Sequence, residues 1–154
     1  MLFLVFQLGK DRYALDTAQV VEVLPLVLHK QLPHAPKGVA GAFTYRGATV
    51  PLLDLSEMAL DRPARVLMST RIIVVSYRAE DGGSHLLGLL AESATETLQR
   101  RAEDFAEAGV AVDEAPYLGP VTTDDRGIIQ RVEIQRLLPV EIRERLFRQP
   151  IEFA

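Results

Sequence analysis

Short apolar segments of strand length alternate with turn-forming residues along most of the chain. The clearest segment is 70–77 (TRIIVVSY), and a turn at 80–83 (EDGG) separates it from a second apolar run at 85–91 (HLLGLLA). Two apolar runs joined by a short Gly/Asp turn are typical of a β-hairpin. The same pattern predicts a first hairpin over 3–15, with its turn at 9–11 (GKD).

The stretch 36–55 (PKGVAGAFTYRGATVPLLDL) combines glycines, a turn and an apolar run. Gly38 and Gly41 mark places where the backbone needs a positive φ or a close approach. The run 50–53 is too short for a helix and contains a proline, which predicts a strand at a sheet edge or bulge. Arg46 lies between an aromatic residue and a glycine, so we expect it on a tight turn that presents its guanidinium to a partner.

Helices are predicted in two places. Residues 56–60 (SEMAL) predict one helical turn with Ser56 as its N-cap, and Asp54 is expected to cap or order the turn before Ser56 rather than to bind a ligand. A C-terminal helix is predicted over 139–148, with a proline in its first turn and arginines towards its end. Its apolar face consists of Leu138, Ile142 and Leu146.

The chain also repeats itself weakly. Glu22 and Glu96 are 74 residues apart, and Gly41 and Gly119 are 78 apart, in the same order. Similar offsets indicate two copies of one small β unit, and many short strands with Gly and Asp turns favour barrels over a βαβ sheet. We therefore predict an all-β fold of two small barrels around a shared core, within one domain over 1–148. The expected divisions are barrels at roughly 1–75 and 76–138, a helix at 139–148 and a tail at 149–154.

Composition narrows the class of protein. The 154 residues are 48% hydrophobic and 25% charged, which is ordinary for a soluble globular domain. The absence of cysteine excludes disulfides, a thiolate nucleophile and a Cys-ligated metal. A net charge of −4 argues against nucleic-acid binding, because phosphate contact needs a basic face. The apolar start, 1–6, lacks a basic flank, and no run approaches the roughly 18 apolar residues of a membrane span. We therefore expect a cytoplasmic protein that does not insert into a membrane.

No catalytic residue, cofactor or metal site is predicted. The sequence has no paired metal ligands at helical spacing, no G-x-S-x-G elbow and no phosphate-binding loop. The three histidines are isolated: His29, His34 and His85. The alternative is a small-barrel enzyme with Glu22, Asp54 and Arg46 around a cleft, which requires the two carboxylates to lie close together.

The candidate functional residues are therefore interaction residues. Glu22 lies in an apolar strand over 20–25, where a carboxylate is unfavourable unless it is paired. Arg46 is its natural partner, because a guanidinium can bind a carboxylate with two hydrogen bonds. The other interpretation places Glu22 on the solvent face of an alternating strand. Tyr45 is either a core residue or an interface aromatic.

At these positions the chain resembles the CheW family of chemotaxis coupling proteins. Four blocks in the family's order carry the resemblance: 20–23 (VVEV), 41–55 (GAFTYRGATVPLLDL), 70–74 (TRIIV) and 88–98 (GLLAESATETL). The resemblance implies two five-stranded SH3-like β-barrels and a non-catalytic scaffold. It also implies two partners, the cytoplasmic hairpin tip of a chemoreceptor and the regulatory domain of a CheA-type histidine kinase, in arrays anchored to the membrane by the receptors.

The family pattern has Asn-Leu before Arg-Gly, whereas this chain has Thr44-Tyr45. This departure favours an alternative chemosensory array, for example a Wsp-like surface-sensing system or a pilus-linked pathway with a different output. The family's receptor-docking positions correspond to Val20, Glu22, Gly41, Arg46 and, more loosely, Gly88, so the resemblance implies a binding role for these residues. With the altered turn included, the expected protein-binding residues are Val20, Glu22, Gly41, Thr44, Tyr45, Arg46, Gly47 and Gly88.

Overall fold

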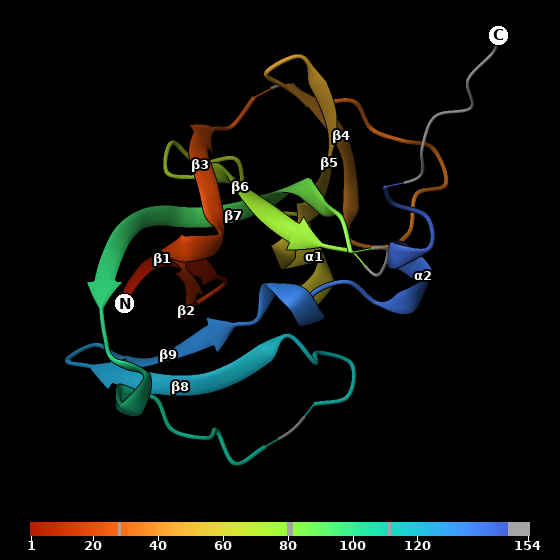
Figure 1. Ribbon diagram of the computed structural model, residues 1–154. Helices are drawn as coiled ribbons and strands as arrows, with labels where there is room; N and C mark the ends of the chain where they lie inside the picture. The colour runs from red at the N-terminus through yellow and green to blue at the C-terminus, as the bar shows by residue number, and fades with distance from the viewer. Residues whose placement is uncertain (28, 80–81, 111, 148–154) are drawn as a thin grey trace, which may run out of the picture.

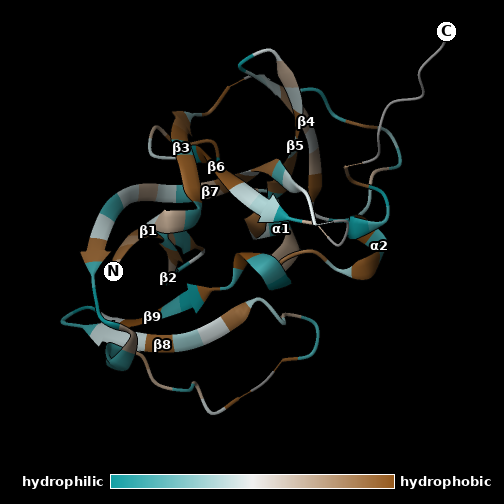
Figure 2. Cartoon of the chain, in the orientation of Figure 1, coloured by the Kyte–Doolittle hydropathy of each residue, from teal (hydrophilic) through white to brown (hydrophobic). Residues whose placement is uncertain are grey.

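The computed structural model describes residues 1–27, 29–79, 82–110 and 112–147 (Figure 1). The fold is mostly β, which confirms the predicted class. Figure 2 shows that strand β3 (Val20–Pro25), at one edge of the sheet, is largely hydrophobic. The strands are β1 (Leu2–Leu8), β2 (Asp11–Asp16), β3 (Val20–Pro25), β4 (Val39–Tyr45), β5 (Ala48–Asp54), β6 (Arg71–Arg78), β7 (Ser84–Gln99), β8 (Leu118–Asp124) and β9 (Gly127–Val132).

The strands pair into two sets of five. The first set has the order β3-β6-β7-β5-β4 and the second has the order β7-β1-β2-β9-β8. Strand β7, 16 residues long, belongs to both, because it pairs first with β6 and then with β1. Each pairing in one set has a counterpart of the same direction in the other, including the parallel pairs β5–β7 and β2–β9. The predicted duplication is therefore present in the topology.

The two sets interleave along the chain. Hairpin β1–β2, from the first sequence repeat, pairs with β7 and β9 of the second, while β6 pairs with β3 of the first repeat. The spatial sets therefore do not divide at residues 75 and 76, because each repeat contributes its first hairpin to the other set. Among the described residues no strand pairing closes either set, so each is an open five-stranded sheet rather than a closed barrel.

One hydrophobic core joins the two sets. Its largest cluster of buried side chains includes Phe6 and Leu15 from the first hairpin, Ile73 and Leu89 from β6 and β7, and Ile134 after β9. A smaller cluster around Phe43, Tyr45 and Leu52 lies within the first set. The shared core predicted from the sequence is confirmed, and it fixes the two sets relative to one another.

The helix after β5 begins one residue earlier than predicted. Helix α1 spans Leu55–Leu60 and its N-cap is Asp54, whose Oδ1 accepts hydrogen bonds from the backbone N–H groups of Ser56 (3.0 Å) and Glu57 (3.2 Å). Asp54 Oδ2 accepts a third from Ala64 N–H at 2.8 Å. The expected Ser56 cap is wrong because a carboxylate with three donors outcompetes a hydroxyl, and Ser56 is fully buried inside the helix.

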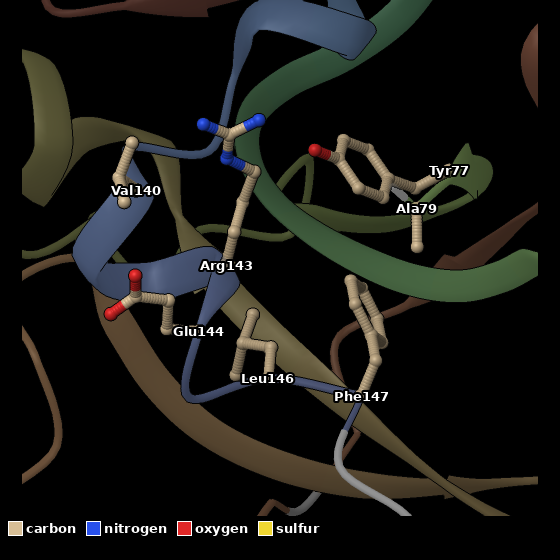
Figure 3. A pocket seen from close by; sticks show the side chains of 7 residues that line it. All are labelled: Tyr77, Ala79, Val140, Arg143, Glu144, Leu146 and Phe147. Carbon is tan, nitrogen blue, oxygen red and sulfur yellow. The ribbon is translucent and has the colours of Figure 1, made fainter. Parts of the chain in front are cut away.

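The C-terminal helix is shorter than the predicted 139–148. Helix α2 spans Val140–Arg143, with Leu138 and Ile142 buried as expected. The chain then turns, and the Phe147 ring stacks on Tyr77 (centroids 5.6 Å apart) and on His85 (4.6 Å). Figure 3 shows Tyr77, Ala79 and Phe147 together on one side of a hollow whose volume is about 210 Å³, with Val140 and Glu144 on the other side. The tail 149–154 lies outside the described residues.

Three 3₁₀ turns complete the fold. They are η1 (Thr17–Gln19), η2 (Ala102–Asp104) and η3 (Ile134–Arg136). Turn η1 leads directly into β3, and η3 follows β9 at the place where α1 follows β5 in the first repeat. In the described part of the chain, no helix is long and apolar enough to cross a membrane.

Candidate interaction site

The turn between β4 and β5 presents Arg46 as predicted. Arg46 and Gly47 occupy the two central positions, and both have positive φ values, 48° and 82°. A two-residue hairpin turn of type I′ needs a positive φ at both positions, and glycine adopts it without strain. The guanidinium is therefore projected from the tip of a short, well-defined hairpin.

Glu22, Tyr45 and Arg46 form one hydrogen-bonded group. Tyr45 Oη donates to Glu22 Oε1 at 2.7 Å, and Arg46 Nη2 donates to the same oxygen at 2.9 Å. The guanidinium also lies over the Tyr45 ring, 5.2 Å from its centroid. The side chain of Arg46 is 75% exposed and that of Glu22 is 38% exposed. The predicted Glu22–Arg46 pair is thus formed, and it lies at the surface.

Tyr45 is buried, with 6% exposure, and packs with Phe43 and Val50. Of the two interpretations of this residue, the core position is the correct one. The hydrogen bond to the Glu22 carboxylate raises the pKa of the Tyr45 phenol, burial raises it further, and the nearby Arg46 charge opposes the shift. The phenol is therefore a donor to Glu22 throughout the neutral pH range.

The structure groups some of the other predicted residues with this site. Thr44 is exposed beside the turn. Val20 does not join the group: the register shifts between Val20 and Glu22, and Val20 packs against the large core cluster that joins the two sets. Gly41 and Gly88 have packing roles. A Cβ on Gly41, where φ is 147°, would lie 1.9 Å from the Lys30 carbonyl oxygen, and one on Gly88 would lie 2.4 Å from the Phe43 ring.

An equivalent ion pair exists in the second set. Arg126, in the turn between β8 and β9, donates from Nη2 to Glu96 Oε2 at 2.7 Å. Here the turn is held differently: both terminal nitrogens of Arg12 bind Asp124, which also accepts the backbone N–H of Arg126 at 2.9 Å. These hydrogen bonds and charges hold the pKa of Asp124 well below its usual range. Sequence reasoning missed the Arg12–Asp124 pair, because its partners are 112 residues apart.

A buried carboxylate was also missed. Glu92 is fully buried where β7 passes from one set to the other, and its Oε1 accepts hydrogen bonds from the backbone N–H (2.9 Å) and Nε (2.8 Å) of Arg65. Burial alone would raise the pKa of Glu92, but Arg65 and the more distant Arg62 outweigh it and lower the pKa. Glu92 thereby anchors the loop after α1, whose tip exposes Val66 (80%) and Met68 (98%). The only sequence signal was an acid in an apolar strand.

The geometry does not support the alternative enzyme. Glu22 is bound by Tyr45 and Arg46, while Asp54 is bound by three backbone N–H groups at the start of α1. The two carboxylates thus have separate partners and do not form an acid–base pair. Across the described ranges, no group of three His, Asp or Glu side chains is placed to hold a metal ion.

The duplicated pairing of the strands places this protein in the class of small all-β domains built from two interleaved five-stranded units. Residues 2–141 match the CheW-like domain, so the chain belongs to the CheW family. It is 26% identical to the chemotaxis protein CheW of Klebsiella aerogenes over 141 residues, covering 90% of this chain and 82% of that one. It is also 26% identical to CheW of Rhizobium meliloti, covering 92% and 89%.

A solved structure shows the same fold. The scaffolding protein TtCheW of Thermoanaerobacter tengcongensis superposes with a TM-score of 0.79 at 23% identity, covering 92% of this chain and 89% of that one. Protein FrzA of Myxococcus xanthus is 31% identical over 91 residues, or 59% of this chain and 54% of its own length. The two CheW relatives are named as chemotaxis proteins and TtCheW as a scaffolding protein, and none of these names describes an enzyme. The chain is a member of the CheW family.

Proposed function

We propose that the protein couples the cytoplasmic hairpin tip of a chemoreceptor to the regulatory domain of a CheA-type histidine kinase. We expect the protein to be cytoplasmic and to associate with membrane-anchored receptor arrays without inserting into the membrane. The observation that carries the proposal is the exposed Glu22–Arg46 pair, held on β3 and the β4–β5 turn at 2.9 Å. Family membership supports it, because the relatives are chemotaxis and scaffolding proteins.

The Glu22–Arg46 ion pair is expected to contribute more to partner binding than to folding stability. An exposed ion pair contributes only about 0–1 kcal/mol to folding, because solvent screens it and the side chains lose entropy. At an interface, water is excluded and the same charges become stronger and orientation-dependent. Thr44 lies exposed beside the turn that carries Arg46, while Gly41 and Gly88 shape the strands beneath it.

Calorimetric titration of the protein with a receptor tip hairpin, and separately with a kinase regulatory domain, tests the proposal. Arg46→Ala should weaken binding of the receptor hairpin about tenfold, equivalent to about 1.4 kcal/mol. Its free energy of unfolding should change by less than about 1 kcal/mol.

Arg126→Ala is the matched control, because it removes the equivalent pair with Glu96 from the second set. It should leave the affinity for the receptor hairpin near that of the wild type. Wild-type protein that binds neither partner would refute the proposed function. Equal losses from the two variants would refute the assignment of the site to the first set. Receptor hairpins from flagellar and surface-sensing pathways, titrated side by side, would separate the two kinds of array.

A further inference from the structure

The first-set turn contains a contact that the family pattern does not provide. The pattern has leucine before Arg-Gly, and leucine has no hydrogen-bond donor in its side chain. In this chain Tyr45 occupies that position, and its hydroxyl reaches Glu22 Oε1 at 2.7 Å. The ring remains buried in the first-set core, so only 6% of the residue is exposed. A residue so buried meets a partner through its neighbours rather than directly.

We propose that Tyr45 is a positioning residue of the binding site. Its hydroxyl fixes the carboxylate of Glu22, and the fixed carboxylate holds the guanidinium of Arg46 in the orientation that the partner meets. The inference rests on the proposed function, since it assigns how the same site is prepared for binding.

The physical need for such a residue follows from the exposure of Arg46. An arginine side chain that is 75% exposed samples many rotamers, and ordering it on binding opposes association. A single exposed ion pair does not order it well. Here the Glu22 carboxylate accepts a short hydrogen bond from the Tyr45 hydroxyl, and a hydrogen bond to a charged acceptor is stronger than one to a neutral acceptor. The face of the Tyr45 ring also attracts the guanidinium, 5.2 Å away.

The second set shows that a turn arginine can be held without a phenol. There, Asp124 accepts the backbone N–H of Arg126 and is itself fixed by Arg12. This arrangement suggests a competing explanation, in which Tyr45 only stabilises the first-set turn. The two explanations differ in what they predict for the side chain of Arg46 and for binding.

The partner-free test is ¹⁵N relaxation of the Arg46 Nε–H group, measured as the heteronuclear NOE. Tyr45→Phe keeps the ring and its stacking but removes the hydroxyl, so it should lower the NOE of Arg46 Nε substantially. Tyr117→Phe is the matched control, because Tyr117 is also 6% exposed but lies in the other core cluster. It should leave the Arg46 signal unchanged. An Arg46 NOE that is the same in Tyr45→Phe and wild type would overturn the proposal.

The binding test is a double-mutant cycle with the receptor hairpin. Tyr45→Phe should weaken binding about fivefold in the wild-type background, the size expected for one lost hydrogen bond, and have no further effect in Glu22→Ala, which has no acceptor for the hydroxyl. The denaturation midpoint of Tyr45→Phe should stay close to that of the wild type. A variant that loses stability but keeps its affinity supports the competing explanation and refutes ours. If the wild type binds no receptor hairpin, the proposed function fails, while the NOE still decides the positioning role.

Discussion

Replacing Gly88 by alanine tests whether this glycine serves packing rather than partner contact. Gly88 lies in β7, opposite Val74 of β6 and Leu52 of β5. An added Cβ would lie 2.4 Å from Cε1 and 2.9 Å from Cζ of the Phe43 ring, whereas ordinary contacts are 3.4–4 Å. The ring would have to move by about 1 Å.

The surroundings leave little room for that movement. Phe43 is 3% exposed and Leu52 and Val74 are fully buried, so the ring is enclosed by well-packed side chains. Extra atoms forced into a packed core destabilise a protein by about 1–3 kcal/mol. For a domain of this size, 2 kcal/mol lowers the melting temperature by about 4–8 °C. We therefore expect a clear loss of stability from a change that adds one methyl group.

Urea denaturation provides the assay, with an unchanged m-value showing that the folded state is still compact. Phe43→Leu in the Gly88→Ala background should recover part of the loss, with a coupling energy of about 0.5–3 kcal/mol. The packing argument is wrong if Gly88→Ala unfolds within about 0.5 kcal/mol of the wild type. If that variant also loses receptor binding while remaining stable, Gly88 is a contact residue as the family resemblance implied.

The remaining predictions concern the cap, the second-set pair and the C-terminal segment. Asp54→Ala should destabilise the protein by about 1–2 kcal/mol, the usual effect of losing an N-cap. Ser56→Ala should be nearly neutral, because the buried hydroxyl of Ser56 has no hydrogen-bond partner. Chemical denaturation of both variants tests which residue is the cap. Since pairing with Arg12 lowers the pKa of Asp124 in the folded state, its contribution is present above the ordinary aspartate value of about 3.9 and is lost as the pH falls. Asp124→Asn should therefore lower stability at neutral pH and flatten the acid limb of stability measured against pH. Phe147→Ala should lower the free energy of unfolding by about 1–2 kcal/mol through lost ring stacking, and an unchanged melting temperature would contradict it.

The sequence allowed the local elements of the fold to be predicted, because these depend on short-range patterns. The hairpin at 71–91 and the tight turn at Arg46 follow from alternation and from glycines that permit a positive φ. The division of strands between the two sets could not be predicted in the same way. In the structure, β1 pairs with β7 and β2 pairs with β9, so the first hairpin joins strands of the second repeat. Because the two repeats have similar local patterns, the sequence is equally compatible with each hairpin pairing inside its own repeat.

The candidate site shows the same limit. The Glu22–Arg46 pair was inferred from an unfavourable carboxylate and one suitable cation, and the structure contains it. The hydroxyl of Tyr45 and the Arg12–Asp124 pair were not found, because their importance depends on which side chains the exchanged strands bring together. The role of Asp54 was predicted in part. Its place at the turn before the helix followed from the sequence, but the three backbone N–H groups that donate to its carboxylate did not.

The two copies of the turn differ in what holds them, and this difference bears on function. In the second set, Arg12 comes from β2 of the other repeat and is 8% exposed, so the turn is tied to the joint between the repeats. A buried arginine–carboxylate pair of this kind is hard to separate, because either partner alone would be an uncompensated buried charge. In the first set, the pair is held only by Tyr45 from its own hairpin, and its arginine remains 75% exposed. The ion pair at the second turn therefore contributes to folding stability, whereas the exposed ion pair at the first turn can be removed with little loss of stability. Thr44 and Arg46 are exposed on this first turn, so we expect partner choice to vary there, whereas the burial of the Tyr45 ring in the core limits what can replace it.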